Sequence, residues 1–197
     1  MKKEEDKMQF IKVKSKNIKG FLFIITILSI MLFNIHNINA ADIFKGGFTT
    51  GKLSYAITTG CNTNFATTAV KQWNGVSSKV KISKYKGKDP MSANLFLDFN
   101  RLKTPNAGLL GVTFLFANGK QVSTNKKWDR AICIQYINPK ANTNNSKIKT
   151  CVHEIGHALG LSHPLAASNP AIMKQGISNR YTLYQVDKNN LISKWGR

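Results

Sequence analysis

The sequence predicts an α/β fold, in which a mostly parallel, twisted sheet packs against helices. Segments that alternate apolar and polar residues, as strands do, are separated by segments whose apolar residues recur at helical spacing. Strand, helix and strand follow one another, an order typical of parallel sheets because parallel neighbours need a long connection. The chain has 197 residues, of which 42% are hydrophobic. This composition excludes a wholly disordered protein and is enough for one domain with its own core.

Five segments have the alternation expected of strands. In the first of them Leu53, Tyr55 and Ile57 fall on one face, and the fourth is followed by the turn sequence Asn118-Gly119. We therefore expect a five-stranded sheet that is mixed but mostly parallel. Its strands are expected at residues 52–58, 80–85, 94–100, 111–117 and 131–137.

Three other segments have the apolar spacing of helices. Residues 62–74 place apolar side chains four positions apart, from Phe65 to Trp73, and end in Asn-Gly. Residues 146–159 carry a comparable apolar stripe. These two long helices are expected to pack on the sheet, and residues 182–195 predict a further, C-terminal helix.

The first forty residues have the pattern of a secretory signal peptide. Residues 1–20 contain seven Lys and three acidic residues, residues 21–33 are an apolar run of thirteen, and the small pair Ala40-Ala41 follows. An uncleaved membrane anchor is the weaker interpretation, because thirteen helical residues span about 20 Å of a roughly 30 Å hydrocarbon core. We expect cleavage after Ala40, secretion, and a single domain formed by residues 41–197.

Most of the positive charge belongs to the predicted exported domain. The formal net charge is +20, of which residues 1–40 contribute +4 and residues 41–197 contribute +16. Five lysines around one predicted strand suit contact with an anionic cell envelope, although a solvated strand face is the simpler explanation. No nucleic-acid-binding motif accompanies them, so a nucleic acid is not an expected partner. The five are Lys79, Lys81, Lys84, Lys86 and Lys88.

One short stretch of the second long helix carries the chemistry. His153 and His157 are four residues apart, so they share a helix face and can bind one Zn²⁺. Glu154 is adjacent and can reach a water on that ion without binding the ion. Gly160 allows the positive φ that turns the chain out of the helix, so that His163 can return as a third ligand. Three protein ligands leave one position for water, which is the layout of a catalytic zinc site.

The stretch HEIGHALGLSH at 153–163, with Ala171-Ile172-Met173 after it, resembles the metzincin signature. Within the metzincins the chain is most similar to the matrixin branch, including its short bacterial members. Gly156, the segment AVKQWNGV at 69–76 and the closing Lys194-Trp195-Gly196 fit that branch. The resemblance covers most of residues 50–196, and its specific part is 153–173.

This resemblance implies a secreted zinc endopeptidase with a metzincin-like fold that acts on proteins or peptides. His153, His157 and His163 would bind one catalytic Zn²⁺, and Glu154 would act as general base and then general acid. Met173 would form a Met-turn beneath the metal. By the same resemblance, residues 109–116 would border the cleft in which an extended substrate lies.

Some features depart from relatives in the larger group. Astacins and serralysins have a Tyr ligand two residues after the Met, where this chain has Gln175. The histidines of residues 41–197 are all in the 153–163 stretch, so a second, structural zinc is not expected. Only about ten residues separate Ala40 from the first predicted strand, which leaves no room for an inhibitory pro-domain. Calcium binding is left open, because the aspartates are scattered: Asp42, Asp89, Asp98, Asp129 and Asp187.

The cysteines leave two interpretations open. Cys61, Cys133 and Cys151 allow one disulfide and one free thiol in an exported chain, or they are buried free thiols. Cys151 lies two residues before His153, about 200° around the helix, so it is not expected to bind the metal.

Two alternative functions compete with the endopeptidase. One is a catalytically inactive metzincin-like scaffold, against which the presence of Glu154 argues. The other is a basic surface-binding module built on the lysine cluster. In each case we expect a monomer.

Overall fold

A computed structural model describes residues 42–165 and 170–197. The predicted signal peptide and its cleavage after Ala40 fall outside these residues and stay predictions. Among the described residues, no helix has both the length and the apolar character needed to cross a membrane.

The six strands of the domain form one mixed sheet in the order β2-β1-β3-β6-β4-β5. The first four strands of that order run parallel to one another, whereas β4 and β5 are antiparallel to their neighbours. The mostly parallel sheet is therefore confirmed. The strands are β1 (Lys52–Ile57), β2 (Lys81–Lys84), β3 (Leu95–Lys103), β4 (Gly111–Ala117), β5 (Lys120–Gln121) and β6 (Arg130–Ile137).

The expected strand count of five was wrong, because β5 is a sixth strand. It has two residues, which is too short for any alternation to be visible. Asn118 and Gly119 both have positive φ, at 52° and 76°, and connect β4 to β5 as a two-residue hairpin. An Asn-Gly pair is the strongest short-range hairpin signal, so the sequence contained the information. A short 3₁₀ helix, Pro90–Ser92, was also not predicted.

The helices begin where side chains cap them. Asn62 accepts a hydrogen bond from Phe65 N and starts α2 (Thr63–Trp73). Thr143 accepts one from Ser146 N and starts α3 (Asn144–Ala158) two residues earlier than predicted. The last helix, α4 (Gln185–Trp195), starts three residues later than predicted, where the Asp187 carboxylate accepts a hydrogen bond from Tyr184 N.

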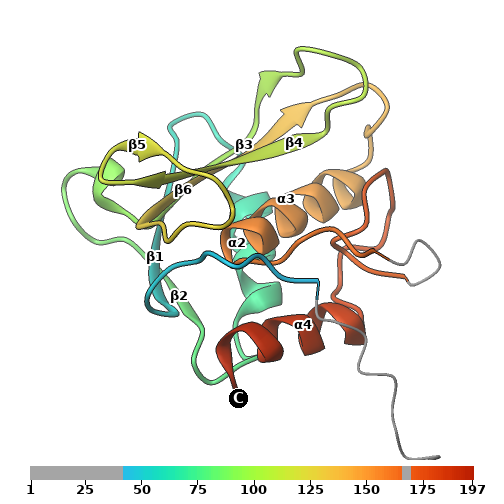
Figure 1. The fold of residues 1–197 in the computed structure, drawn as a ribbon. Coiled ribbons are helices and arrows are strands. Elements are labelled where there is room, and N and C mark those ends of the chain that lie inside the picture. Colours follow the sequence, from blue (N-terminus) through green and yellow to red (C-terminus); the bar gives the residue numbers. More distant parts are fainter. Residues whose placement is uncertain (1–41, 166–169) are drawn as a thin grey trace, which may run out of the picture. The chain divides into compact units, whose positions relative to one another are not determined.

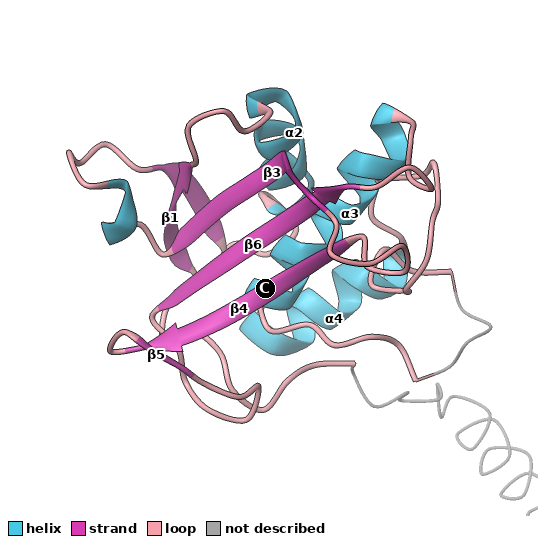
Figure 2. Ribbon diagram, turned by 90° about the horizontal axis from the view of Figure 1, so that it is seen from above, coloured by secondary structure: helices cyan, strands magenta, loops and turns pink. Residues whose placement is uncertain are grey.

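Helices α2 and α3 cover one face of the sheet, and α4 lies on the other side of α3 (Figure 1). Figure 2 shows the sheet from its open face with the helices behind it. The core fills the space between these layers. Its fully buried side chains include Leu95, Leu97 and Phe99 of β3, Trp73 of α2, Val152 and Ile155 of α3, and Leu191 of α4.

All three tryptophans hold the backbone of α3. Trp73 Nε1 donates to Val152 O at 3.0 Å, and Trp128 Nε1 donates to Ala158 O at 3.2 Å. Trp195 Nε1 donates to Leu159 O at 2.9 Å. The last carbonyls of a helix have no partner within it, so two of these indoles satisfy groups that α3 leaves unpaired. They also fix the helix that carries the predicted site.

The cysteines are free thiols. Cys133 and Cys151 are fully buried, and burial raises the pKa of both. The Cys61 sulfur accepts a hydrogen bond from Phe99 N at 3.0 Å. Of the two interpretations left open by the sequence, the structure agrees with free thiols.

Candidate metal centre

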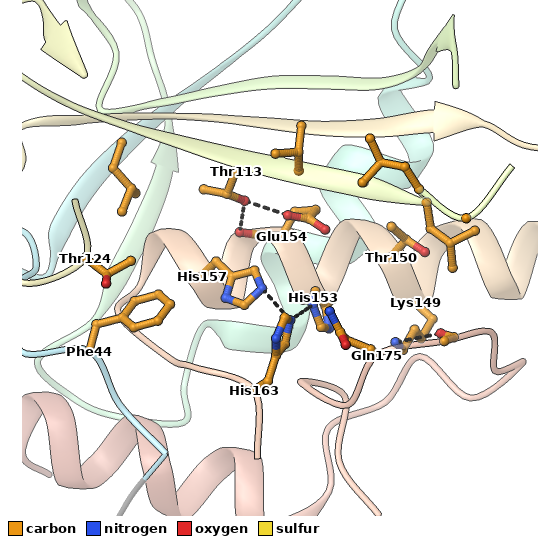
Figure 3. A pocket seen from close by; sticks show the side chains of 17 residues that line it. Phe44, Thr113, Thr124, Lys149, Thr150, His153, Glu154, His157, His163 and Gln175 are labelled. Atoms are coloured by element: carbon orange, nitrogen blue, oxygen red, sulfur yellow. Dashed lines mark hydrogen bonds between the residues drawn. The ribbon is translucent and has the colours of Figure 1, made fainter. Parts of the chain in front are cut away.

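The three predicted ligand histidines come together at the C-terminal end of α3. His153 and His157 are on one face of the helix, as their spacing predicts. The helix ends at Ala158 with Leu159 as its C-cap, and Gly160 then adopts φ +91°, which turns the chain back. As a result His163 Nε2 lies 3.1 Å from the Nε2 atoms of both other rings (Figure 3). The predicted role of Gly160 is confirmed.

Hydrogen bonds fix the direction in which two of these rings present their lone pairs. His153 Nδ1 lies 2.8 Å from Ile172 O, and His157 Nδ1 lies 2.9 Å from Leu161 O. A carbonyl only accepts, so each Nδ1 carries the proton and each Nε2 is left with a bare lone pair. Two bare nitrogens directed at one point, with the Nε2 of a third ring 3.1 Å from both, form a donor set for a cation.

The donor set fits zinc. Tetrahedral coordination with Zn–N bonds near 2.0–2.1 Å separates ligand nitrogens by about 3.3–3.4 Å, close to the 3.1 Å found here. Burial lowers the pKa of all three imidazoles, that of His157 to about 4, so they are neutral at pH 7 as a metal ligand must be. A search of the described residues for groups of His, Cys, Asp or Glu side chains that could hold a metal ion finds these three histidines.

The depressed imidazole pKa values predict how stability changes with pH in the metal-free protein. The pKa of His157 is about 4 in the fold and 6.5 when unfolded, so between these values the unfolded chain binds more protons. The free energy of unfolding should therefore fall as pH drops from 6.5 to 4, by on the order of 2–3 kcal/mol for this residue.

Urea denaturation with a chelator at several pH values between 7 and 4 measures this dependence. The variant His157→Gln, which cannot titrate, should show a shallower pH dependence than the wild type. Equal slopes in the two proteins would contradict the prediction.

Glu154 faces the cavity beside the histidines. Its carboxylate Oε2 accepts a hydrogen bond from Thr113 Oγ1 at 2.8 Å, and its side chain is 4% exposed. Burial raises the pKa of this carboxyl to about 7, while Thr113 and Lys149 act in the opposite direction. Gly111 on β4 makes room for it, because a Cβ there would lie 2.7 Å from Glu154 Oε1. Such a carboxyl is poised to exchange protons near neutral pH.

Met173, which the sequence predicted to form a Met-turn beneath the metal, is 1% exposed and packs against α3 at Gly156. Its support is Asp187 of α4, whose carboxylate accepts hydrogen bonds from Ile172 N at 2.9 Å and Met173 N at 3.2 Å. Ile172 O in turn accepts the bond from His153. The Met-turn is thus connected to α4 on one side and to an imidazole on the other.

Gly156 permits the packing of Met173 against α3. A Cβ at this position would lie 2.4 Å from Met173 Sδ and 2.9 Å from a ring carbon of Trp73. We expect Gly156→Ala to lower the free energy of unfolding by roughly 1–2 kcal/mol, because overpacking outweighs the better helix propensity of Ala.

Chemical denaturation tests this expectation. The matched control is Gly108→Ala, where a Cβ would meet only Asn106 Oδ1 at 3.6 Å. If Gly156→Ala were as stable as this control, the packing argument would be wrong.

A cavity of about 520 Å³ opens in front of these groups. Helix α3 forms one wall and β4 the other. Along β4, residues 111–116 pair with β6, but β5 pairs only with Phe116 and Ala117. In the described chain the first part of β4 therefore has an unpaired edge toward the cavity, where residues 109–116 were expected to border a cleft.

Several residues of this centre were not predicted. Thr113 contacts Glu154 from β4, and Asp187 holds the Met-turn from α4. Phe44 stacks on the His157 ring with centroids 5.8 Å apart and planes 20° apart. Its segment is held against the turn after α3, since Phe44 N donates to Gly160 O at 2.8 Å. Lys149, one helical turn before His153, also lines the cavity.

Fold and site together define a class, the zinc metalloproteases of the metzincin type. Within that class, the sequence model of the matrixin family matches residues 49–195 of this chain. The chain belongs to the matrixin family.

Two solved structures of myroilysin are similar to this chain. The first has a TM-score of 0.51 at 11% identity and covers 77% of this chain and 96% of the myroilysin chain. The second has a TM-score of 0.48 at 14% identity and covers 81% of this chain and 93% of the myroilysin chain. At this identity the first similarity shows a shared fold. The comparison with curated proteins found no matching sequence.

Proposed function

We propose that this matrixin is a secreted endopeptidase that uses one zinc ion held by His153, His157 and His163. The observation that carries the proposal is the convergence of three Nε2 atoms, two of them with their proton fixed on the other ring nitrogen. When bound there, zinc supplies a Lewis acid that acidifies a water molecule and polarises the scissile carbonyl.

Glu154 is the proposed general base and general acid. Glu154 lines the cavity, and Thr113 holds its Oε2. Among the described residues no hydrogen bond reaches Oε1, so this oxygen is the one proposed to accept a proton from the attacking water. The same oxygen then delivers the proton to the leaving amine. A carboxyl whose pKa is near 7 can do both at neutral pH, because neither protonation state is strongly favoured.

The unpaired edge of β4 is the proposed binding edge for the substrate. An extended peptide can add to a free sheet edge through main-chain hydrogen bonds, which are independent of its sequence. Such pairing suits an internal stretch of a polypeptide, and for this reason we propose an endopeptidase acting on proteins or peptides. Met173 supports the site without reacting.

The setting of the enzyme is proposed from the sequence. A signal peptide removed after Ala40 would export a monomeric domain, and nucleic acid is not an expected partner. The lysine cluster of Lys79 to Lys88 borders the edge strand β2 with exposed side chains, which suits contact with an anionic cell envelope. Weakening of binding to anionic polymers as salt rises would support that contact.

Proteolysis with and without metal tests the function. The purified protein is incubated with a denatured protein and a peptide library, and the products are identified by mass spectrometry. We expect internal cleavages that a chelator abolishes and added zinc restores. Peptide binding without cleavage would instead favour the inactive scaffold.

A further inference from the structure

Lys149 is a buried lysine in the wall of the cavity. It lies on α3 one turn before His153 and is 4% exposed. Its Nζ donates to Lys174 O at 2.6 Å and to Gly176 O at 3.0 Å, both just after Met173. An ammonium has three donors, so these two carbonyls leave one N–H for a further acceptor. Figure 3 shows Lys149 on the same side of the cavity as Gln175.

Among the residues that the structure describes, Lys149 has no carboxylate within ion-pairing distance. The ion pair found among them joins Arg101 and Asp98. Burial lowers the pKa of Lys149 to about 8, which still leaves the amine mostly charged at pH 7. A buried charge is unfavourable unless it is paired and hydrogen-bonded. The carboxylates of Glu154 and Asp187 act on this charge only from beyond ion-pairing distance, and the two carbonyls satisfy hydrogen bonds without carrying a charge. The third N–H of Lys149 is therefore left for an anion that enters the cavity.

The position of Lys149 indicates which part of a substrate would supply that anion. Four helical residues rise about 6 Å, so Lys149 is one turn along the helix from His153. This separation is comparable to the reach of one acidic side chain from a residue next to the bond under attack. A carboxylate can also come from the end of the peptide itself, if the chain terminates just after that bond.

We propose that Lys149 selects substrates that carry a carboxylate beside the cleaved bond. The proposal rests on the proposed function and names the substrate class for the same cavity. The carboxylate is either an Asp or Glu side chain or the terminal carboxylate of the peptide, and the experiment separates the two sources. Lys149 acts here as a specificity-determining residue.

The test uses matched peptides and the zinc-loaded protein. After the library has located the cleaved bond, one pair of end-blocked peptides differs only by Glu or Gln beside that bond. A second pair carries Gln there and ends just beyond it in a free carboxylate or an amide. One of the two pairs contains the carboxylate that Lys149 binds. Within that pair we expect kcat/KM to be roughly 10- to 100-fold higher for the peptide with the carboxylate than for the peptide with the amide, as for a hydrogen bond to an ionised partner.

The variant Lys149→Met keeps the length of the side chain and removes its charge. It should reduce that ratio to about one. A purely structural role, such as holding the loop at 174–176, would lower kcat/KM for both peptides alike and leave the ratio unchanged. The matched control is Lys194→Met, because Lys194 also donates to two backbone carbonyls, Phe44 O and Gly46 O, but does not line the cavity. The control should keep the wild-type ratio.

Binding without turnover separates the two proposals. Titrating the same peptides into Glu154→Gln by fluorescence anisotropy should show the charged peptide binding more tightly, and adding Lys149→Met should remove the difference. Cleavage with no charge preference in either pair would overturn the role of Lys149 and leave the protease standing. If the wild type cleaves nothing in the library, binding of the uncleaved library peptides is compared instead, and a preference for acidic peptides that Lys149→Met removes would overturn the protease and keep Lys149.

Discussion

Glu154→Gln is expected to lower kcat by about 10²- to 10⁴-fold, the range that a positioned general base contributes. The amide has nearly the same shape as the carboxylate, and its oxygen can still accept the hydrogen bond that Thr113 donates to Oε2. It cannot accept the proton of the attacking water. Peptide cleavage at pH 7, together with zinc content and a thermal melt of the same sample, measures the effect.

Zinc content and melting temperature should stay close to those of the wild type, because Glu154 is not among the proposed ligands. The matched control is Asp129→Asn, the same carboxylate-to-amide change at an exposed residue whose carboxylate accepts a hydrogen bond from Asn118 N. It should cleave as the wild type does. Cleavage at the wild-type rate by Glu154→Gln would exclude Glu154 as the base.

His163→Ala is expected to remove both zinc and activity. His163 Nε2 lies 3.1 Å from the Nε2 atoms of both other rings, and without it two imidazoles with water are a poor zinc site. The loss of affinity should exceed the 10- to 100-fold that removing a ligand's hydrogen-bond partner costs. Metal analysis after dialysis should find about one zinc per wild-type chain and almost none in the variant.

Stability gives a second measurement of the same site. Zinc that binds only the folded chain raises the melting temperature by mass action, so a chelator should lower it in the wild type and not in His163→Ala. Ser162→Ala, a change at the neighbouring and part-exposed residue, is the control and should respond to chelator as the wild type does. A variant lacking His163 that retains zinc with wild-type affinity would refute the proposed ligand set.

The parts of the site that could be predicted are local in sequence. The spacing of His153 and His157, and the need for a positive φ at Gly160, depend on backbone geometry within a few residues. The sequence contained the hairpin signal of Asn118-Gly119 as well, although a two-residue β5 has no pattern of its own. Helix α3 started early because Thr143, which is not part of the apolar stripe, caps it.

The parts that could not be predicted depend on contacts between distant segments. Thr113 lies 41 residues before Glu154, and their contact requires the register of β4 on β6 to be known. Asp187 looked like one of several scattered aspartates, yet it holds the Met-turn from α4. In the sequence Lys149 is only a polar residue on a predicted helix, and the fold is needed to show that it lines the cavity. No pattern in the sequence of one chain predicts these contacts between distant residues.

The dependence of the Met-turn on Asp187 has a consequence for the order in which the protein matures. A growing chain that has been synthesised past His163 already contains all three imidazoles, but it lacks the carboxylate that holds Ile172 and Met173 in place. We expect the centre to become competent only once α4 has formed and docked. During synthesis the unfinished polypeptide would thus be unable to digest itself or its neighbours.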